Sequence, residues 1–167
     1  YAHENDEYKG IDLRGMDTIT DFSMGSLASI DNADNLNIKI TNTFPYFNYF
    51  RNSNFFKPTG TVNISDYKGS LAYLFKGIDM DKLEIICDKQ LTQTDAKYMF
   101  AYASCSNEDK IVTLFSKMQN ITNLSYMFYN AFIRKAPLLP LSTTDCRYMF
   151  YNCSTMTETP ANWLQSY

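Results

Sequence analysis

The stretch Ser125-Tyr126-Met127-Phe128 decides the fold, because the same pattern recurs along the chain at nearly even spacing. The other copies are Ala72-Tyr73-Leu74-Phe75, Lys97-Tyr98-Met99-Phe100 and Arg147-Tyr148-Met149-Phe150, with a looser copy at Asn48-Tyr49-Phe50. Their closing phenylalanines are separated by 25, 25, 28 and 22 residues. Self-similarity at such a period is typical of repeat architectures, in which each unit buries its apolar face only against its neighbours.

Each copy carries a spaced set of apolar residues around its phenylalanine. In the clearest copy these are Leu124, Met127, Phe128 and Ala131, which lie at positions −4, −1, 0 and +3 from the phenylalanine. Residues at this spacing share one face of a helix, so the pattern predicts a short helix in each copy. Residues of the type that caps helix N-termini precede the apolar set, and they include Asp95, Asn123 and Asp145.

Short runs of strand-like sequence lie upstream of the copies. Residues 36–40 alternate between apolar and polar side chains, and residues 61–65 do the same. The runs 83–87 and 111–115 are comparable, while 11–13 would open the array and 138–141 would close it. Alternation with period two is typical of a half-buried strand.

Together these patterns predict an α/β fold, a leucine-rich-repeat-like solenoid of about six strand–turn–short-helix repeats with a small parallel β-sheet. We expect one repeat-array domain over residues 1–167, with a degenerate N-terminal repeat at about 11–34 and the clearest repeats at about 80–160. Residues 107–110 are predicted to form an exposed inserted loop. The predicted structural core consists of Phe50, Phe75, Phe100, Phe128, Phe150, Met99, Met127, Met149, Cys146 and Cys153.

The C-terminal copies resemble a known family. Residues 120–130 and 136–154 are similar to the bacterial surface-protein repeat of about 25 residues found in the BspA-like leucine-rich-repeat group. The resemblance implies a curved parallel sheet with short helices outside it. It also implies an extracellular or cell-surface location and a role in adhesion or recognition, and it supplies no catalytic residues.

Composition excludes several classes of partner. The net charge is −3 and no cluster of Lys and Arg occurs, whereas nucleic-acid binders carry a basic face. No apolar run approaches the roughly 18 residues that span a bilayer, so we expect no membrane insertion. The chain opens at Tyr1 without an initiator methionine, and we interpret it as a processed or excised fragment.

The sequence predicts no enzyme, no metal site and no cofactor. His3 is the only histidine, so a catalytic triad or a histidine-based metal site cannot be built. Asp79 and Asp81 are expected in a solvated turn, because the glycine and distal glutamate of a calcium loop are missing. Cys146 and Cys153 would lie about 10 Å apart on a helix, too far for a disulfide.

Aromatic residues are unusually abundant at 16% of the chain, with 13 Tyr and 12 Phe in 167 residues. The candidate binding residues are Tyr98, Tyr102, Tyr126, Tyr129, Tyr148 and Tyr151. Tyr126 and Tyr129 are three apart, as are Tyr148 and Tyr151, so each pair would share a helix face away from the phenylalanines. One interpretation is that these rings pack between neighbouring helices. The other is an exposed aromatic ridge, since tyrosine is typical of recognition surfaces.

Our functional hypothesis is therefore a non-catalytic surface module that binds an extracellular protein or a glycan. The main alternative is a structural subunit of a larger assembly, such as a phage tail or capsid decoration, which would place the chain in a virion and bring it into contact with neighbouring subunits. A remote alternative is an enzyme of unknown type.

Overall fold

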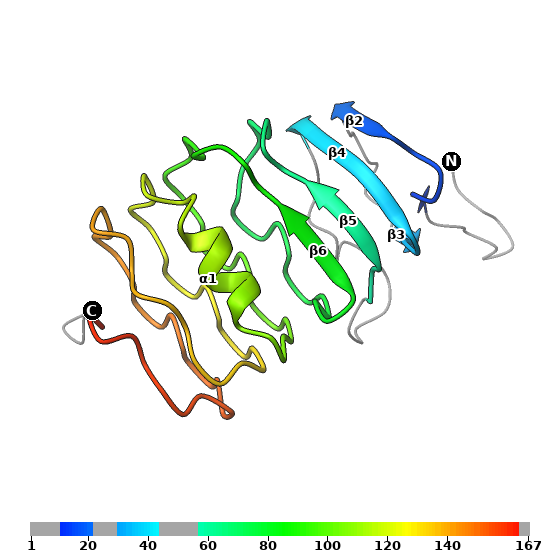
Figure 1. Cartoon of the computed structure of the whole chain (residues 1–167). Helices are drawn as coiled ribbons and strands as arrows, with labels where there is room; N and C mark the ends of the chain where they lie inside the picture. The colour runs from blue at the N-terminus through cyan, green and yellow to red at the C-terminus, as the bar shows by residue number, and fades with distance from the viewer. Residues whose placement is uncertain (1–10, 22–29, 44–56, 164–167) are drawn as a thin grey trace, which may run out of the picture.

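The computed structural model describes residues 11–21, 30–43 and 57–163, and it shows successive passes of the chain stacked side by side (Figure 1). The strands are β1 (Ile11–Asp12), β2 (Thr18–Asp21), β3 (Ile30–Asn32), β4 (Leu36–Thr43), β5 (Gly60–Asn63) and β6 (Leu83–Ile86). The helix α1 (Asp109–Phe115) follows. After α1, the described residues contain turns and single bridges in place of strands.

The sheet is parallel throughout, with strand order β2-β4-β5-β6, and β1 pairs separately with β3. Ile38 of β4 faces Val62 of β5, which in turn faces Ile85 of β6. Parallel strands need a crossover between them, and the turn-rich segments supply it by returning the chain across the core. The strands predicted at 36–40, 61–65 and 83–87 are confirmed within a few residues at each end.

The prediction of about six strand–turn–short-helix repeats is wrong. In the part of the chain that the structure describes, α1 is the only helix. The segments that were expected to be helical are chains of turns at residues 72–77, 97–102, 125–130 and 147–152. The sequence similarity between the copies is expressed as this turn-rich conformation.

Backbone hydrogen bonds explain why these segments are not helices. Within the second clear copy, the N–H of Met99 donates to the carbonyl of Ala96 at 3.1 Å, and the N–H of Ala101 donates to Tyr98 at 3.1 Å. Such i→i−3 bonds close β-turns, whereas an α-helix needs i→i−4 bonds. The intervening N–H groups point out of the segment, and that of Phe100 donates to the carbonyl of Met127 in the next copy at 3.0 Å.

The buried positions nevertheless match those expected from the sequence. Leu124, Met127, Phe128 and Ala131 are all buried, as are their counterparts in the copies at Phe75 and Phe100. The turns overlap, because a new i→i−3 bond begins at every second residue, and this turn chain buries positions −4, −1, 0 and +3. Helix and turn chain therefore bury the same positions, and apolar spacing alone cannot distinguish them.

The residues predicted as helix caps form local turns. The Oδ1 atoms of Asp95, Asn123 and Asp145 each accept the N–H two residues later, at 3.0, 2.9 and 3.1 Å. This i→i+2 arrangement is an Asx turn, which competes with helix initiation. The same three residues also form single parallel bridges with one another across the stack.

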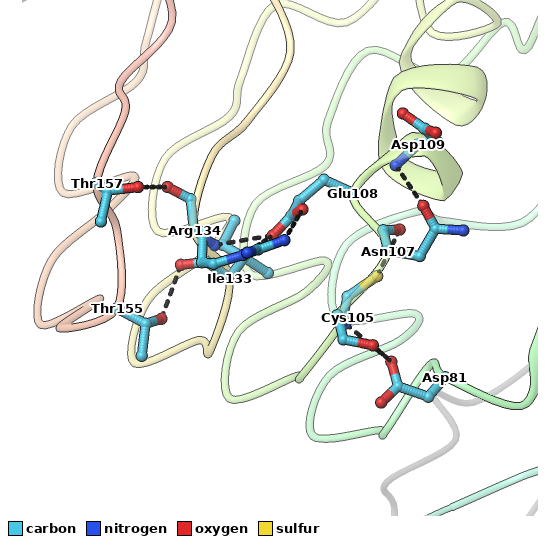
Figure 2. A network of polar contacts seen from close by, with 10 residues as sticks. Asp81, Cys105, Asn107, Glu108, Asp109, Ile133, Arg134, Thr155 and Thr157 are labelled. Atoms are coloured by element: carbon cyan, nitrogen blue, oxygen red, sulfur yellow. Dashed lines mark hydrogen bonds and ion pairs between the residues drawn. The ribbon is translucent and has the colours of Figure 1, made fainter.

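Residues 111–115 were predicted as a strand and are instead part of α1, which packs beside β6 (Figure 1). Ile111, Leu114 and Phe115 are buried at helical spacing. No strand occurs at 138–141. The exposed loop predicted at 107–110 is only partly right, because Asn107 and Asp109 are exposed but α1 already begins at Asp109 and Glu108 is buried. Glu108 is only 5% exposed and pairs with Arg134, whose Nη2 lies 3.2 Å from Oε1 (Figure 2).

The hydrophobic core is one cluster that runs from Leu13 to Cys153. Phe75, Phe100, Phe128 and Phe150 stack in order, with ring centroids 5.7, 5.8 and 5.7 Å apart. Phe150 is less buried than the others, and Trp163 lies against it at 4.8 Å. Phe50 lies outside the described residues, as does much of the predicted repeat at 11–34. The remaining predicted core residues, Met99, Met127, Met149, Cys146 and Cys153, are buried.

Candidate functional site: a tyrosine ladder

Seven tyrosines form two adjoining rows on the turn segments, and we call them the tyrosine ladder. The first row consists of Tyr73, Tyr98, Tyr126 and Tyr148, which stand two residues before the stacked phenylalanines. The second row consists of Tyr102, Tyr129 and Tyr151. The structure thus brings together all six tyrosines that the sequence singled out as candidates.

Rings of the first row stack face to face. Tyr98 lies 4.8 Å from Tyr73 and 4.7 Å from Tyr126, with interplanar angles of 5° and 4°. Tyr148 continues the row at 5.2 Å from Tyr126. Such offset stacks contribute about 0.5–1.5 kcal/mol per pair beyond the area that they bury. Stacking also covers the ring faces inside the row, so these rings offer mainly their edges and hydroxyls to a partner.

The second row meets the first edge to face. Tyr129 lies 5.7 Å from Tyr126 at 65°, and Tyr151 lies 5.8 Å from Tyr148 at 74°. Tyr129 and Tyr151 stack on each other at 5.5 Å. The two rows therefore support each other as one surface with fixed ring orientations. A surface whose rings are already ordered loses little side-chain entropy when it binds.

The ladder is accessible at its surface. Tyr148 and Tyr151 are each 54% exposed and Tyr102 is 41% exposed, whereas Tyr98, Tyr126 and Tyr129 are partly buried. The two interpretations of the sequence each describe part of this arrangement. The rings do contact rings of neighbouring copies, but those copies are turns and the ladder remains open to solvent.

The first-row tyrosines adopt an unusual backbone conformation. Tyr73, Tyr98, Tyr126 and Tyr148 have φ values of 64°, 57°, 58° and 53°. A left-handed conformation costs a non-glycine residue roughly 1–2 kcal/mol. In the type II turn, the third residue needs a positive φ, so the turn chain places these residues there. Ring stacking and the cross-copy hydrogen bonds offset this cost.

Lys76 extends the second row toward the N-terminus. Its ammonium lies 5.6 Å from the ring centroid of Tyr102 and 6.0 Å from that of Tyr73. A cation at this range is attracted to the negative face of an aromatic ring. Lys76 occupies the position that Tyr129 and Tyr151 hold in later copies, one residue after the phenylalanine.

The phenol of Tyr98 has a raised pKa, chiefly because burial disfavours the charged form and secondarily because of the neighbouring phenols. Since an ordinary tyrosine pKa already lies near 10, the hydroxyl of Tyr98 is neutral at physiological pH. It can therefore both donate and accept a hydrogen bond. No charge on this central ring competes with its stacking.

Other candidate chemistry is sparse among the described residues. They contain no group of three or more His, Cys, Asp or Glu that could hold a metal ion. Burial raises the pKa of the Cys105 and Cys153 thiols, which disfavours reactive thiolates. The carboxylate of Asp79 accepts the N–H of Asp81 at 3.0 Å in a local turn. His3 lies outside the described residues.

A groove of about 500 Å³ lies between β6 and α1. Its lining mixes acidic and basic side chains, including Glu84, Asp109 and Lys110. The Lys110 ammonium is already engaged, since it donates to the carbonyls of Met80, Asp81 and Leu83 at 2.6, 3.1 and 2.9 Å. The Lys110 ammonium therefore serves to hold α1 against the backbone of residues 80–83.

Sequence reasoning missed three polar features. These are the Glu108–Arg134 pair, the Lys110 ammonium on three carbonyls, and Lys76 over the tyrosine rings. Each joins residues about 25–30 apart in the chain, the spacing between neighbouring copies. The repeat spacing was the signal available for them, because it brings side chains of adjacent copies together.

Comparison of the chain with protein-family models, with curated proteins and with solved structures gives no match. The interpretation of the ladder therefore depends on its own geometry. Within residues 11–21, 30–43 and 57–163, no helix combines the length and the apolar character required to cross a bilayer.

Proposed function

We propose that this chain is a non-catalytic recognition module, located outside the cell, that uses the tyrosine ladder to bind a protein or a glycan. The observation that carries the proposal is the pair of ordered, solvent-accessible rows of phenols. Tyrosine offers large contact area and a hydrogen-bonding hydroxyl at small entropic cost, which is why it is frequent in binding surfaces.

The extracellular location rests on the resemblance of residues 120–130 and 136–154 to the BspA-like surface repeat. The non-catalytic role is supported by the scarcity of convergent ionisable groups among the described residues. Enzyme sites normally gather groups with shifted pKa values in one pocket. Here most of the shifted carboxylates belong to separate ion pairs, such as Asp66 with Lys39 and Lys89, while the pKa of Asp81 is lowered chiefly by the N–H of Ser106.

The test begins with a binding screen against arrays of extracellular protein domains and of surface glycans, run beside a measurement of mass in solution. The double variant Tyr129→Ala and Tyr151→Ala should abolish binding to any partner found, because it removes two of the three rings of the second row. Its circular dichroism spectrum should match that of the parent, since both rings lie outside the buried cluster.

Two controls sharpen this result. The variant Tyr129→Phe and Tyr151→Phe keeps the rings and removes only the hydroxyls, so it separates ring contact from hydrogen bonding. Leu141→Ala alters the most exposed apolar side chain away from the ladder, at 97% exposure, and should leave binding unchanged. Equal binding by the parent and the double alanine variant would refute the ladder as the binding surface.

A further inference from the structure

The groove between β6 and α1 borders an open strand edge in the middle of the stack. β6 is the last strand of the four-stranded sheet in the part of the chain that the structure describes, and β5 covers only one of its edges. The N–H groups of Gly60 and Ile64 donate to the carbonyls of Lys82 and Ile86 across that edge, at 3.1 and 2.8 Å. Alternate residues of a strand direct their main-chain groups to opposite edges, so those of Ile85 face α1.

Two residues of β6 direct their main-chain groups toward the groove, and these groups differ in their partners. Leu83 donates its N–H to the carbonyl of Met80 at 3.2 Å, and its own carbonyl accepts a bond from the Lys110 ammonium at 2.9 Å. Among the described residues, the N–H and the carbonyl of Ile85 have no partner. Ile85 lines the groove and therefore offers it one donor and one acceptor.

The groove exists because a helix follows β6 where earlier passes place a strand (Figure 1). Neighbouring strands lie about 4.8 Å apart, whereas a helix with its side chains is about 10 Å across. α1 therefore stands too far from β6 to pair with it, and a volume of about 500 Å³ stays open between them. That volume lies within the range of ligand pockets.

Both ends of α1 are held against the preceding pass. At its start, the Lys110 ammonium bonds to the carbonyls of residues 80–83. Beyond its end, the carbonyl of Lys117 accepts the N–H of Leu91 at 2.8 Å. The walls of the groove are thus fixed before any ligand enters, and a preformed site avoids the entropic cost of ordering itself on binding.

The uncommitted charges at the groove are mainly acidic. Glu84 and Asp109 are exposed, and neither carboxylate has a partner among the described residues. Asp81 adds a third carboxylate, one of whose oxygens already accepts hydrogen bonds. In the described lining, the one ammonium that carbonyls do not already hold is that of Lys82, because Lys110 is engaged. Charge complementarity therefore favours a ligand with a positive group.

We propose that this groove binds an extended peptide segment that carries a basic side chain. The segment adds beside β6 as a short strand, donates one N–H to the carbonyl of Ile85 and accepts the N–H of Ile85. Its lysine or arginine side chain reaches the carboxylates of Glu84 and Asp109. Strand addition at an exposed edge is an established mode of peptide recognition. This second site goes beyond the tyrosine ladder and does not depend on it.

The main chain of Ile85 selects a polypeptide as the occupant. In an antiparallel pair, two opposite residues exchange both of their N–H···O bonds, so one residue of an added strand satisfies both free groups at once. The site is not the place of a further pass of this chain, because β6 and α1 belong to consecutive passes and both are present. It lies between them, away from either end of the stack (Figure 1).

Amide hydrogen exchange followed by NMR tests whether the edge is open. In the free protein the amide of Ile85 should exchange at least tenfold faster than those of Glu84 and Ile86, which face β5 by the same alternation. Equal protection of the three amides in the free monomer would overturn the proposal, since another part of the chain would then already cover the edge.

The probe is a blocked tetrapeptide of alternating valine and arginine, which spans about 13 Å when extended. It should slow exchange at Ile85 at least fivefold and shift the amide resonance of Thr113, which lines the opposite wall. Two control peptides should bind at least fivefold more weakly. One has glutamate in place of arginine, and the other has N-methylated backbone amides that cannot donate. Unchanged exchange with the arginine peptide, or equal binding of all three, would overturn the proposal.

Variants of the two walls locate the bound peptide. Glu84→Gln should weaken the arginine peptide at least threefold, and Thr113→Arg at least tenfold, because it places a competing cation in the groove. Asp17→Asn is the matched control, since it removes an exposed carboxylate at the opposite edge of the sheet, beside β2. It should leave peptide binding unchanged. Equal weakening by all three variants would show only non-specific attraction to an acidic protein and would overturn the site.

The groove and the tyrosine ladder can fail separately. The double variant Tyr129→Ala and Tyr151→Ala should bind the arginine peptide as the parent does, so a loss confined to the screened partner leaves the groove intact. Protection of Ile85 that appears only with rising protein concentration, together with a dimer mass, would assign the edge to a second copy and overturn a peptide ligand.

Discussion

The passes that contain β4, β5 and β6 and the passes that contain the stacked tyrosines hold themselves together in different ways. In the first region, which we call the sheet region (residues 36–86), neighbouring strands pair over four residues. In the second, the ladder region (residues 96–153), the described residues form no paired strands, and single parallel bridges flank the turn segments. The turn segments with their phenylalanine stack continue through both.

This difference teaches which part of the repeated sequence is structurally constant. The strand position holds β6 in one pass, α1 in the next and no regular element at 137–141. The turn segment keeps its i→i−3 hydrogen bonds in every described pass from residue 72 on, and the segments at 72–77, 97–102 and 125–130 also donate alternate N–H groups to the next segment. The constancy of the turn and the variability of the strand match the sequence, where the Tyr-Xaa-Phe motif is clear and the strand runs are irregular.

The largest effect is expected from removing a central rung of the phenylalanine stack that both regions share. Phe100→Ala should cost about 3–5 kcal/mol in the free energy of unfolding, because the ring is 1% exposed and leaves a cavity between two other rings. Phe150→Ala should cost about 2 kcal/mol, since this ring is less buried. Urea unfolding curves provide the measurement. Equal losses in the free energy of unfolding for both variants would contradict a phenylalanine stack whose central rings are more completely buried than its last one.

A smaller effect should follow from the backbone conformation of the turns. Asn130 has a φ of 55°, and its counterpart in an earlier pass is Gly77 with a φ of 74°. Asn130→Ala and Asn130→Gly both lose the bond from the Asn152 amide, at 2.7 Å, so their difference isolates the conformational cost. The glycine variant should be more stable by about 1 kcal/mol. Thermal unfolding measures this, and a more stable alanine variant would argue against the left-handed conformation.

Acid should affect the two regions through different carboxylates. In the sheet region, hydrogen bonds from Lys39 and Lys89 lower the pKa of Asp66 to about 2. In the ladder region, burial raises the pKa of Glu108, but the bonds from Arg134 outweigh it, and the pKa lies below the ordinary value. A folded-state pKa below the unfolded value means stability that is complete above the unfolded pKa and is lost as pH falls through the folded one.

The difference in melting temperature between the parent and Asp66→Asn should therefore be constant near neutral pH and shrink as pH falls from about 4 toward 2. The difference in melting temperature between the parent and Glu108→Gln should likewise be constant near neutral pH and shrink below about pH 4.5. Melting temperatures measured from pH 7 to pH 2 report both. If the difference in melting temperature between parent and variant instead increased as the pH fell, the folded protein would not be stabilising the charged forms of these carboxylates.

The smallest effect distinguishes α1 from the strand that the sequence predicted there. Thr113 is exposed near the end of α1. Thr113→Ala should raise the free energy of unfolding by about 0.5 kcal/mol, because alanine is the better helix former. In a strand the same change would lower it, since threonine is favoured there. The sign of the change in urea unfolding therefore decides between the two conformations.

The buried positions and several of the paired strands could be predicted from the sequence, because both follow from the spacing of apolar residues. The strands at 36–40 and 61–65 alternate strictly, which is typical of a half-buried strand, whereas 83–87 alternates only over its first three residues. The set around Phe128 was correctly placed in the core but in the wrong conformation. Positions −4, −1, 0 and +3 share one face of a helix and are also the buried positions of this chain of turns, and no residue type there excludes either.

Two features resist prediction for physical reasons. The left-handed conformation of Tyr98 and Tyr126 is costly for a residue with a Cβ atom, and it is offset by ring stacking and hydrogen bonds between distant copies. At 109–115, the β-branched residues Ile111, Val112 and Thr113 favour a strand locally, yet the longer spacing of 28 residues between Phe100 and Phe128 leaves room for a helix. A helix advances 1.5 Å per residue against about 3.3 Å for a strand, so it uses more residues to cross the same width.

The contact between Trp163 and Phe150 supplies a local spectroscopic probe. Trp163 is the single tryptophan of the chain, and it lies at the last described rung of the phenylalanine stack. Its fluorescence emission therefore reports on the environment of that end alone, while near-ultraviolet dichroism of the tyrosines reports on the ladder. Transitions that coincide in the two signals would mean that the protein melts as one cooperative unit, and an earlier transition in the indole signal would mean that fraying begins at this end.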